Sequence, residues 1–414
     1  MCAGTQLTSD DSTMKQFIFS KLQTTQGYID QGFNGLMARL PSEVTARNTL
    51  LFCVLSLLCL GTVMVASASM PYGEAEMGNN PYYFIQRQFI YIVVALVAAC
   101  IAYKIRLQFW FGKTTILLWL GSLVLLGLVL AVGNDVNGSK RWLRLGPLNL
   151  QPSEVAKFTM AVFTADYVVR RASEVRDSFK SFFRLSIPVG STVLLILAEP
   201  DLGASAVIIM TMFIVFFLAG SPMKAFMTLG VAILGALIAL VLLEPYRLER
   251  LMSFSDPWKD PQGSGYQLAQ SLMAFGRGEW FGTGLGHSIQ KLAYLPEAHT
   301  DFMLAVTAEE LGFVGIVVIF SLSFLMVACC MRIGFRALQN HHLRSGYLAY
   351  AIASIFLLQI CVNAGMNMGL IPTKGLTLPF ISYGGSSLLM CAFMIGVMFK
   401  IDRDTVDKTE QKTT

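Results

Sequence analysis

A short polar run directly before a long apolar segment contains the side chain best suited to acid–base chemistry. The run is LPEAHTDF at 295–302, and its last acidic residue, Asp301, would lie near a helix start at the boundary between lipid and water. A carboxylate that is partly desolvated there can have a raised pKa and act as a general base. Asp is also a favoured N-cap, which is the structural alternative. The residues alone leave both interpretations open.

A second polar pair lies at the start of an apolar stretch, where ionisable residues are costly and are therefore candidates for function. In the run QPSEVAK at 151–157, Pro152 and Ser153 favour a helix start, and Glu154 and Lys157 stand three residues apart on one helix face. At that spacing the two side chains can pair. They would form either a structural ion pair that holds a helix bundle together or the polar floor beneath a substrate cavity.

The run SKRWLR at 139–144 places Arg141 and Arg144 just before that pair. Arg binds phosphate oxygens in a bidentate fashion, and Trp142 suits a membrane interface. A pyrophosphate near the headgroup region would fit this cluster. Ordinary interfacial anchoring is the alternative, and for Lys140 it is the better one.

Prolines, glycines and hydroxyls crowd the segments IPTKGLTLP at 371–379 and SYGGSS at 382–387. This composition predicts an irregular backbone, which at membrane depth is tolerated only when it is buried in protein or lines a cavity. Lys374 in this segment would either meet an anionic ligand or be solvated.

The elements that must position these residues are membrane-spanning helices. Of the 414 residues, 54% are hydrophobic and only 14% are charged, whereas a soluble domain carries about 25% charged residues. Apolar runs near or above 18 residues recur along the whole chain. The net charge of +5 is spread over many loops without a basic stripe, which argues against nucleic acid as a partner. No CxxC or Cys/His spacing indicates zinc or redox chemistry.

We expect an all-α polytopic membrane protein with about ten transmembrane helices and a large extracytoplasmic loop, 244–302, between the seventh and eighth. The predicted spans are about 48–69, 85–104, 114–133, 153–170, 183–199, 201–220, 223–243, 303–330, 345–369 and 377–400. The fifth and sixth are separated by Glu199-Pro200-Asp201, which would form either a tight turn or a broken helix.

Lys and Arg in the short loops predict the orientation, because such loops are enriched in positive charge on the cytoplasmic side. Alternate connections carry most of this charge, and they contain Lys104, Arg106, Lys113, Arg170, Arg171, Arg176, Lys180, Arg184, Lys224, Arg332, Arg336 and Arg344. The prediction is a cytoplasmic N-terminal segment 1–47, a ten-span membrane domain 48–401 and a cytoplasmic tail 402–414 that we expect to be disordered. The 134–152 loop carries three positive charges outside, and this exception favours an anionic ligand there.

The 244–302 loop is long for a compact bundle, and loops of that length are often functional. Its GTGLG run at 282–286 is only a weak signal for nucleotide binding, because ATP is scarce outside the cell and no strand precedes the run.

Together these motifs resemble the SEDS family (shape, elongation, division and sporulation). The residues that carry the resemblance are KRWLRLGPLNLQPSEVAK at 140–157, AEPDLGAS at 198–205, PWKDPQGSGYQLAQSLMAFGRGEWFGTGLG at 257–286, YLPEAHTDF at 294–302, AEELGFVG at 308–315 and GLIPTKGLTLPFISYGGSS at 369–387. The likeness covers about 45–402, and SASMP at 67–71 and NPYYFIQRQ at 80–88 resemble the division type rather than the elongation type.

The resemblance implies peptidoglycan glycosyltransfer from lipid II during septal wall synthesis, with undecaprenyl pyrophosphate as the leaving group. It implies that Asp301 is the catalytic residue. The expected substrate- and pyrophosphate-binding residues are Arg141, Arg144, Lys374, Glu154, Lys157, Gln151, His299, Thr373 and Ser386.

A divalent cation, magnesium or manganese, is the one cofactor that this chemistry suggests, and its ligands are not assigned. The expected partners are lipid II, membrane lipids, a class B penicillin-binding protein (a septal transpeptidase of the FtsI type) and other divisome proteins, in the bacterial inner membrane at the septum. Two alternatives remain. A lipid II flippase would transport its substrate in vesicles and form no polymer, and a non-catalytic division scaffold would tolerate changes at Asp301 and Glu154.

Overall fold

The computed structural model describes residues 43–136, 139–146, 148–177, 180–222, 224, 227–228, 230–231, 235, 254, 256–260, 263, 265–372 and 375–413. The chain divides into two units, Met1–Asn48 and Thr49–Thr414. Only the start of one helix is described in the first unit, so the architecture below is that of the second.

Helices make up most of the described chain. They are α2 (Glu43–Glu76), α3 (Tyr83–Lys104), the 3₁₀ helix η1 (Leu107–Trp110), α4 (Lys113–Val132), α5 (Pro152–Arg170), α6 (Ala172–Asp177), α7 (Lys180–Ala198), α8 (Leu202–Leu218), α11 (Tyr266–Gly278), the π-helix η2 (Gln290–Tyr294), α12 (Met303–Gln339), α13 (Leu343–Asn367) and α14 (Gly385–Thr413). The strands are β1 (Asn134–Val136), β2 (Ser139–Leu145) and β3 (Leu148–Leu150).

The prediction of a helical, polytopic membrane protein is confirmed. In the described part of the chain, six helices are long and apolar enough to cross a membrane, and two shorter apolar helices are α7 and α8. Every predicted span other than 223–243 overlaps one of these helices. The few described residues of 223–243, which are 224, 227–228, 230–231 and 235, are helical, and the rest lie outside the described residues. The break at Pro200 is a tight turn, because α7 ends at Ala198 and α8 begins at Leu202.

Two details of the helical prediction are corrected by the structure. The last predicted span was expected to begin near 377, but 377–384 is irregular and α14 begins at Gly385. The tail 402–414 was expected to be disordered, yet α14 continues without interruption to Thr413. The prolines and glycines of 371–387 therefore delay the helix start, as their composition favours.

Helix α5 lies inside the bundle, where it packs against α4, α8, α13 and α14. It carries the ionisable residues Glu154, Lys157 and Asp166, and all three are buried. A polar helix is tolerable in a bilayer only when neighbouring helices cover it. These charges keep α5 out of the set of helices that are long and apolar enough to cross a membrane, although α5 is central to the fold.

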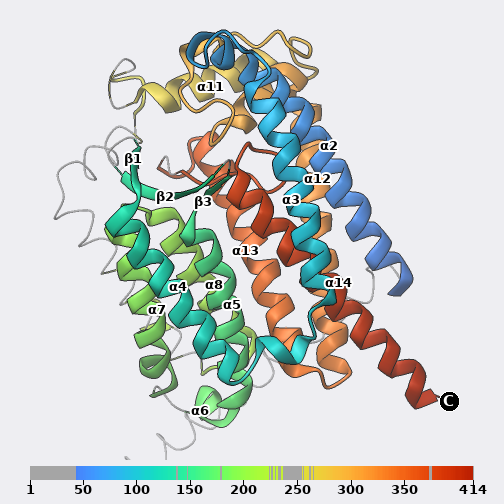
Figure 1. Ribbon diagram of the computed structural model, residues 1–414. Coiled ribbons are helices and arrows are strands. Elements are labelled where there is room, and N and C mark those ends of the chain that lie inside the picture. The colour runs from blue at the N-terminus through green and yellow to red at the C-terminus, as the bar shows by residue number, and fades with distance from the viewer. Residues whose placement is uncertain are drawn as a thin grey trace, which may run out of the picture. The chain divides into compact units, whose positions relative to one another are not determined.

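A small antiparallel sheet, in the order β1-β2-β3, is the one departure from the all-α prediction among the described residues. It forms within the 134–152 loop, and β2 contacts α4 and α5 while β3 contacts α14. Gly146 has a φ of 63°, which a glycine adopts without strain at the turn after β2. The sheet and α11 lie toward the same end of the bundle in Figure 1, and this end also holds the start of α12. We call it the Asp301 end.

Candidate active site

The backbone of Asp301 is held by two asparagines of α13. The side-chain amides of Asn363 and Asn367 both donate to the carbonyl oxygen of Asp301, each at 3.0 Å. Asn363 also donates to the carbonyl oxygen of Leu376 at 2.6 Å. Both asparagines are fully buried and stand one helical turn apart. They therefore fix Asp301 and the irregular segment at 376 relative to the same helix.

The carboxyl group of Asp301 is left without a hydrogen bond from any residue that the structure describes. Burial, and next the negative charge of Glu297, raise the pKa of Asp301 to about 7, while Arg141 opposes the shift. The N-cap alternative is wrong, because Phe302 occupies the cap position of α12 and no side chain caps that helix. Asp301 is therefore a half-buried carboxyl poised to exchange a proton near neutral pH.

Arg141 lies beside Asp301 and is clamped in place. Its Nε donates to the carbonyl oxygen of Glu199 at 2.8 Å, and its Nη2 donates to that of Pro200 at 2.7 Å. A Cβ placed on Gly375 would lie 3.1 Å from Oδ2 of Asp301 and 3.9 Å from Nη1 of Arg141. The third nitrogen of the guanidinium therefore faces the same glycine as the carboxyl group of Asp301.

Two further carboxyl groups flank Pro200 in the turn between α7 and α8. Glu199 is fully buried, and neither of its carboxyl oxygens has a partner among the described residues. Burial, and next the charge of Asp201, raise the pKa of Glu199 to about 8. Asp201 caps α8 by accepting from the N–H of Ala204 at 3.0 Å. Sequence reasoning treated this turn only as a helix break, although two acidic residues between apolar runs are a signal for function.

Gln151 and Ser386 connect three elements at the Asp301 end. The N–H of Gln151 donates to Oγ of Ser386 at 2.9 Å, and that hydroxyl donates to the carbonyl oxygen of Asn149 at 2.6 Å. The side chain of Gln151 donates to Oγ of Ser153 at 3.1 Å and to Oδ2 of Asp201 at 3.4 Å. Ser386 thus joins the start of α14 to β3 and α5, and its hydroxyl is occupied by protein partners.

The predicted pairing of Glu154 and Lys157 is present. Nζ of Lys157 lies 2.7 Å from Oε1 of Glu154, and both side chains are buried in α5. The second carboxylate oxygen of Glu154, Oε2, has no partner among the described residues. The two side chains therefore form an ion pair inside the bundle, and Oε2 of Glu154 can still accept a hydrogen bond.

His299 is buried in an aromatic cluster. Its ring centroid lies 4.7 Å from that of Phe84, 5.2 Å from Tyr72 and 5.8 Å from Tyr383. Burial lowers the pKa of His299, so its imidazole is neutral at pH 7. These contacts fasten the 295–302 turn to α2 and α3.

Arg144, Thr373 and Lys374 are the predicted binding residues that remain. Arg144 is exposed, and its odd spacing from Arg141 puts the two side chains on opposite faces of β2. The structure therefore brings Arg141, and not Arg144, to Asp301. Thr373 and Lys374 lie outside the described residues.

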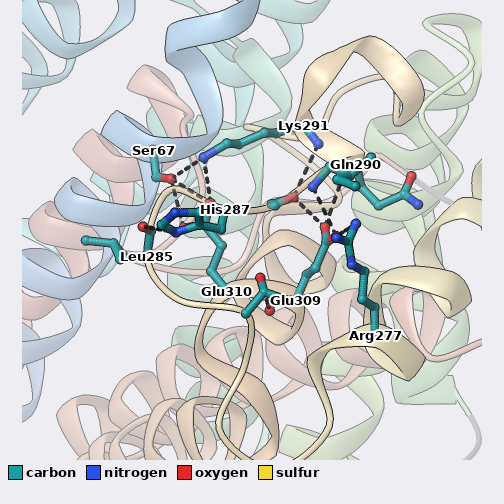
Figure 2. Close-up of polar contacts among 11 residues, drawn as sticks. Ser67, Arg277, Leu285, His287, Gln290, Lys291, Glu309 and Glu310 are labelled. Carbon is teal, nitrogen blue, oxygen red and sulfur yellow. Dashed lines mark hydrogen bonds and ion pairs between the residues drawn. The ribbon is translucent and has the colours of Figure 1, made fainter.

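A second carboxylate cluster, which the sequence analysis did not single out, lies farther along α12. Glu309 accepts hydrogen bonds from Arg277, from the hydroxyl of Ser288 and from the N–H groups of Ile289 and Gln290. Figure 2 shows that its neighbour Glu310 faces a different set of donors. Nζ of Lys291 lies 2.7 Å from Oε1 of Glu310, and Oγ of Ser67 on α2 lies at the same distance.

The described residues do not form a ready-made metal site. No group of three or more His, Cys, Asp or Glu side chains among them is arranged to hold a metal ion. Asp201 already accepts hydrogen bonds from Ala204, Ser153 and Gln151. A cation here would need substrate phosphates to complete its shell, which is common for Mg²⁺.

The fold and the site define an integral membrane protein with a proton-accepting carboxyl group at one end of a helical bundle. The FtsW/RodA/SpoVE model, described as "Cell cycle protein", matches residues 48–407. The chain belongs to this family, which is the SEDS family that its motifs resemble.

Relatives of known name cover most of the chain. A protein of Acinetobacter baylyi, "Probable peptidoglycan glycosyltransferase FtsW", is 60% identical over 92% of this chain and 96% of its own length. A protein of the same name from Escherichia coli O157:H7 is 44% identical over 86% of each chain.

Two solved structures share the fold. One belongs to work on "Structural coordination of polymerization and crosslinking by a peptidoglycan synthase complex", and it matches with a TM-score of 0.71 and 30% identity over 86% of this chain and 97% of that one. The rod shape determining protein RodA of Thermus thermophilus matches with a TM-score of 0.60 and 28% identity over 86% and 96% of the two chains.

Proposed function

We propose that this chain is a peptidoglycan glycosyltransferase of the division type, which polymerises lipid II into β-1,4-linked glycan strands in septal wall synthesis. Family membership and the names of its relatives support this function. The observation that carries the mechanism is the half-buried carboxyl group of Asp301, which has a pKa of about 7 and no hydrogen-bond donor among the described residues.

The reaction requires one base and one charged site for the leaving group. The sugar of lipid II is linked α to a pyrophosphate, and the product is linked β, so a single displacement with inversion is the simplest scheme. Asp301 accepts the proton of the acceptor's 4-hydroxyl while that oxygen attacks C1 of the donor sugar. The bond between C1 and the pyrophosphate oxygen breaks, and its electrons leave with undecaprenyl pyrophosphate. A base of this kind contributes about 10²–10⁴-fold to the rate.

Arg141 is the described residue best placed to meet the leaving group. Two of its nitrogens hold the carbonyl oxygens of Glu199 and Pro200, which orients the guanidinium and leaves Nη1 facing Gly375. Oriented positive charge that is already in place stabilises charge as it develops on the pyrophosphate. We also expect Lys374 and Thr373 to reach this ligand. A divalent cation bound by the substrate phosphates would supply further neutralisation of phosphate charge.

The other residues of the predicted set act on the shape of this site. Gln151 and Ser386 hold the starts of α5 and α14 together, and His299 fastens the 295–302 turn. The Glu154–Lys157 pair sets the polar interior of α5 beneath them. These residues hold Asp301 and Arg141 in position and do not take part in the reaction themselves.

The location follows from the same proposal. The Asp301 end faces the periplasm and both termini face the cytoplasm, because Lys and Arg concentrate in the opposite loops. The protein works in the bacterial inner membrane at the septum. Its partner is a class B penicillin-binding protein, which the likeness to a chain of a peptidoglycan synthase complex supports, and we expect other divisome proteins beside it.

The deciding experiment is glycan polymerisation by the purified protein with its transpeptidase partner and lipid II, resolved on a gel. Asp301→Asn should lower the rate by about 10²–10⁴-fold, because the amide cannot accept the proton. Asn363→Asp is not a suitable control, since Asn363 holds the backbone of Asp301. Glu279→Gln is suitable, because Glu279 is exposed and no described side-chain contact joins it to Asp301.

The same experiment separates the alternatives. A flippase would move lipid II across vesicles with no polymer formed, whether or not Asp301 is present. A scaffold would support division with Asp301→Asn and Glu154→Gln. Full polymerisation by a folded Asp301→Asn protein would contradict the assignment of the base.

A further inference from the structure

In the part of the long loop between α11 and η2, apolar side chains point outward and charged side chains point inward. Residues 280–289 contain no Asp, Glu, Lys or Arg. The neighbouring charge of Lys291 turns inward to Glu310, where it is buried. Outward side chains are aromatic instead, and Phe281 is 82% exposed and Trp280 67% exposed. A loop in water would place its charges outside, whereas a surface in lipid places them inside.

The backbone of this segment is also satisfied by protein rather than by water. Helix α12 is broken at Gly312, where φ is 67° and ψ is −167°. The carbonyl oxygens of Glu309 and Glu310 accept from the N–H groups of Thr283 and Gly284 at 2.9 and 3.1 Å. In return, the N–H groups of Phe313 and Val314 donate to the carbonyl oxygens of 279 and 280 at 2.9 and 3.1 Å. The segment thus supplies the partners that the helix break would otherwise leave unpaired, which is a requirement in hydrocarbon.

Glycines allow this close approach. A Cβ on Gly282 would lie 2.2 Å from the carbonyl oxygen of Glu310, and a Cβ on Gly312 would lie 2.3 Å from the nitrogen of Gly282. Both glycines have a positive φ. The GTGLG run therefore docks one backbone on another, which also explains its composition without a nucleotide.

The exposed face continues a surface that already faces lipid. Phe313, Val314, Val317 and Val318 form one exposed stripe on α12, which is long and apolar enough to cross a membrane. The rings of Trp280 and Phe313 meet edge to face, with centroids 5.3 Å apart. The stripe of the helix and the aromatic residues of the segment are therefore continuous.

The depth of the segment follows from helix length. The part of α12 after the break, Phe313–Gln339, would extend about 40 Å at 1.5 Å per residue, enough by itself to cross a hydrocarbon core of about 30 Å. The break then lies near one boundary of the core. Trp favours that boundary because its ring has both an apolar face and a polar N–H.

We propose that residues 280–292 are a membrane-embedded segment, docked on the break of α12, whose aromatic face contacts the lipid acyl chains of the leaflet at the Asp301 end. Glu309 and Glu310 hold it there from the protein side, as Figure 2 shows. The large loop is thus divided between a part in water and a part in lipid. This inference does not depend on the reaction proposed for Asp301.

The test is the quenching of tryptophan emission in the full-length protein reconstituted into phosphatidylcholine vesicles. Lipid brominated in the upper part of its acyl chains quenches from within the bilayer, and iodide quenches from water. The contribution of Trp280 is the difference between the protein and Trp280→Phe. Trp258 is the matched control, because it lies in the same long loop and is 55% exposed. We expect Trp280→Phe to remove a component that brominated lipid quenches, and Trp258→Phe to remove a component that iodide quenches.

A second variant guards against a change of fold in Trp280→Phe. Adding Phe281→Trp to that background should restore the lipid-quenched component, because position 281 lies on the same exposed face. Quenching of Trp280 by iodide and not by brominated lipid would overturn the proposal and indicate a surface in water. Quenching by neither would also overturn it, since the face would then be covered by protein.

Discussion

Asp301 and Glu309 lie eight residues apart in the chain, yet their carboxyl groups have opposite surroundings. Glu309 accepts from one guanidinium, one hydroxyl and two backbone N–H groups. The carboxyl group of Asp301 has no such donor among the described residues, and its pKa is raised to about 7. The first carboxyl group is held in place by its donors, whereas the second is free to bind and release a proton.

The comparison shows how two nearby carboxyl groups serve different purposes. The carboxylate of Glu309 holds the 288–290 segment to α12, because both of its oxygens already accept hydrogen bonds. Asp301 is instead held by its backbone, through Asn363 and Asn367, so its position is fixed without any donor reaching its carboxyl group. The changes below should affect stability at one carboxylate and activity at the other.

The largest effect on stability should follow Glu309→Ala. The variant leaves the hydroxyl of Ser288 and the N–H groups of Ile289 and Gln290 without their acceptor. Each buried donor left unsatisfied costs about 1–3 kcal/mol. Thermal unfolding in detergent micelles measures it. Glu279→Gln is the control and should stay within about 0.5 kcal/mol of the parent protein. An unchanged melting temperature in Glu309→Ala would mean that the cluster does not fasten the loop.

Arg141→Lys should lower polymerisation about tenfold to a hundredfold. The ammonium group keeps the charge but cannot hold the carbonyl oxygens of Glu199 and Pro200 together, and hydrogen bonds to a charged group contribute about 1.5–3 kcal/mol. Arg144→Lys, on the opposite face of β2, is the control and should be nearly silent. If Arg144→Lys lost as much activity as Arg141→Lys, the pyrophosphate would contact both faces of the strand.

The dependence of kcat/KM on pH should report Asp301 directly. A base must be deprotonated, and the pKa of Asp301 is about 7, so activity should rise with pH and level off above about 7. Below that value it should fall about tenfold per pH unit. Glu297→Gln removes a negative charge that raises the pKa of Asp301, so the profile should move to lower pH. A profile that does not move in Glu297→Gln would assign the titration to another group.

The smallest effect should come from Gly375→Ala. The added methyl group would lie 3.1 Å from Oδ2 of Asp301, and crowding of this kind costs about 1 kcal/mol, or roughly fivefold in rate. The control is Gly384→Ala, which meets the methyl group of Thr377 at the same 3.1 Å. Equal losses of activity in both variants would point to a general disturbance of the 371–387 segment.

Local patterns were enough to predict the helices, the break at Pro200 and the pairing of Glu154 with Lys157. Each of these features depends on residues within a few positions of one another, so the spacing of residues along the sequence is enough to predict it. Asp301 as a base was only one of two interpretations, and the structure rejects the other because Phe302 holds the cap position.

Contacts between distant segments could not be predicted from spacing. The amide of Asn363 reaches a carbonyl oxygen 62 positions away, and Ser67 reaches Glu310 across 243 positions. Polar residues inside apolar spans mark such places without naming their partners, as Asn363, Asn367, Glu309 and Glu310 all do. The small sheet was missed for a different reason, because two of its three strands have only three residues, too few to show alternation.

The asparagines of α13 have a consequence for genetics. Asn363 and Asn367 both hold the backbone of Asp301, and Asn363 also holds that of Leu376. Both asparagines are placed by a helix whose residues are largely buried. A substitution in the core of α13 would displace the base before it unfolds the protein. A screen for inactive but well-expressed mutants should therefore recover changes in Leu343–Asn367 that never touch the substrate.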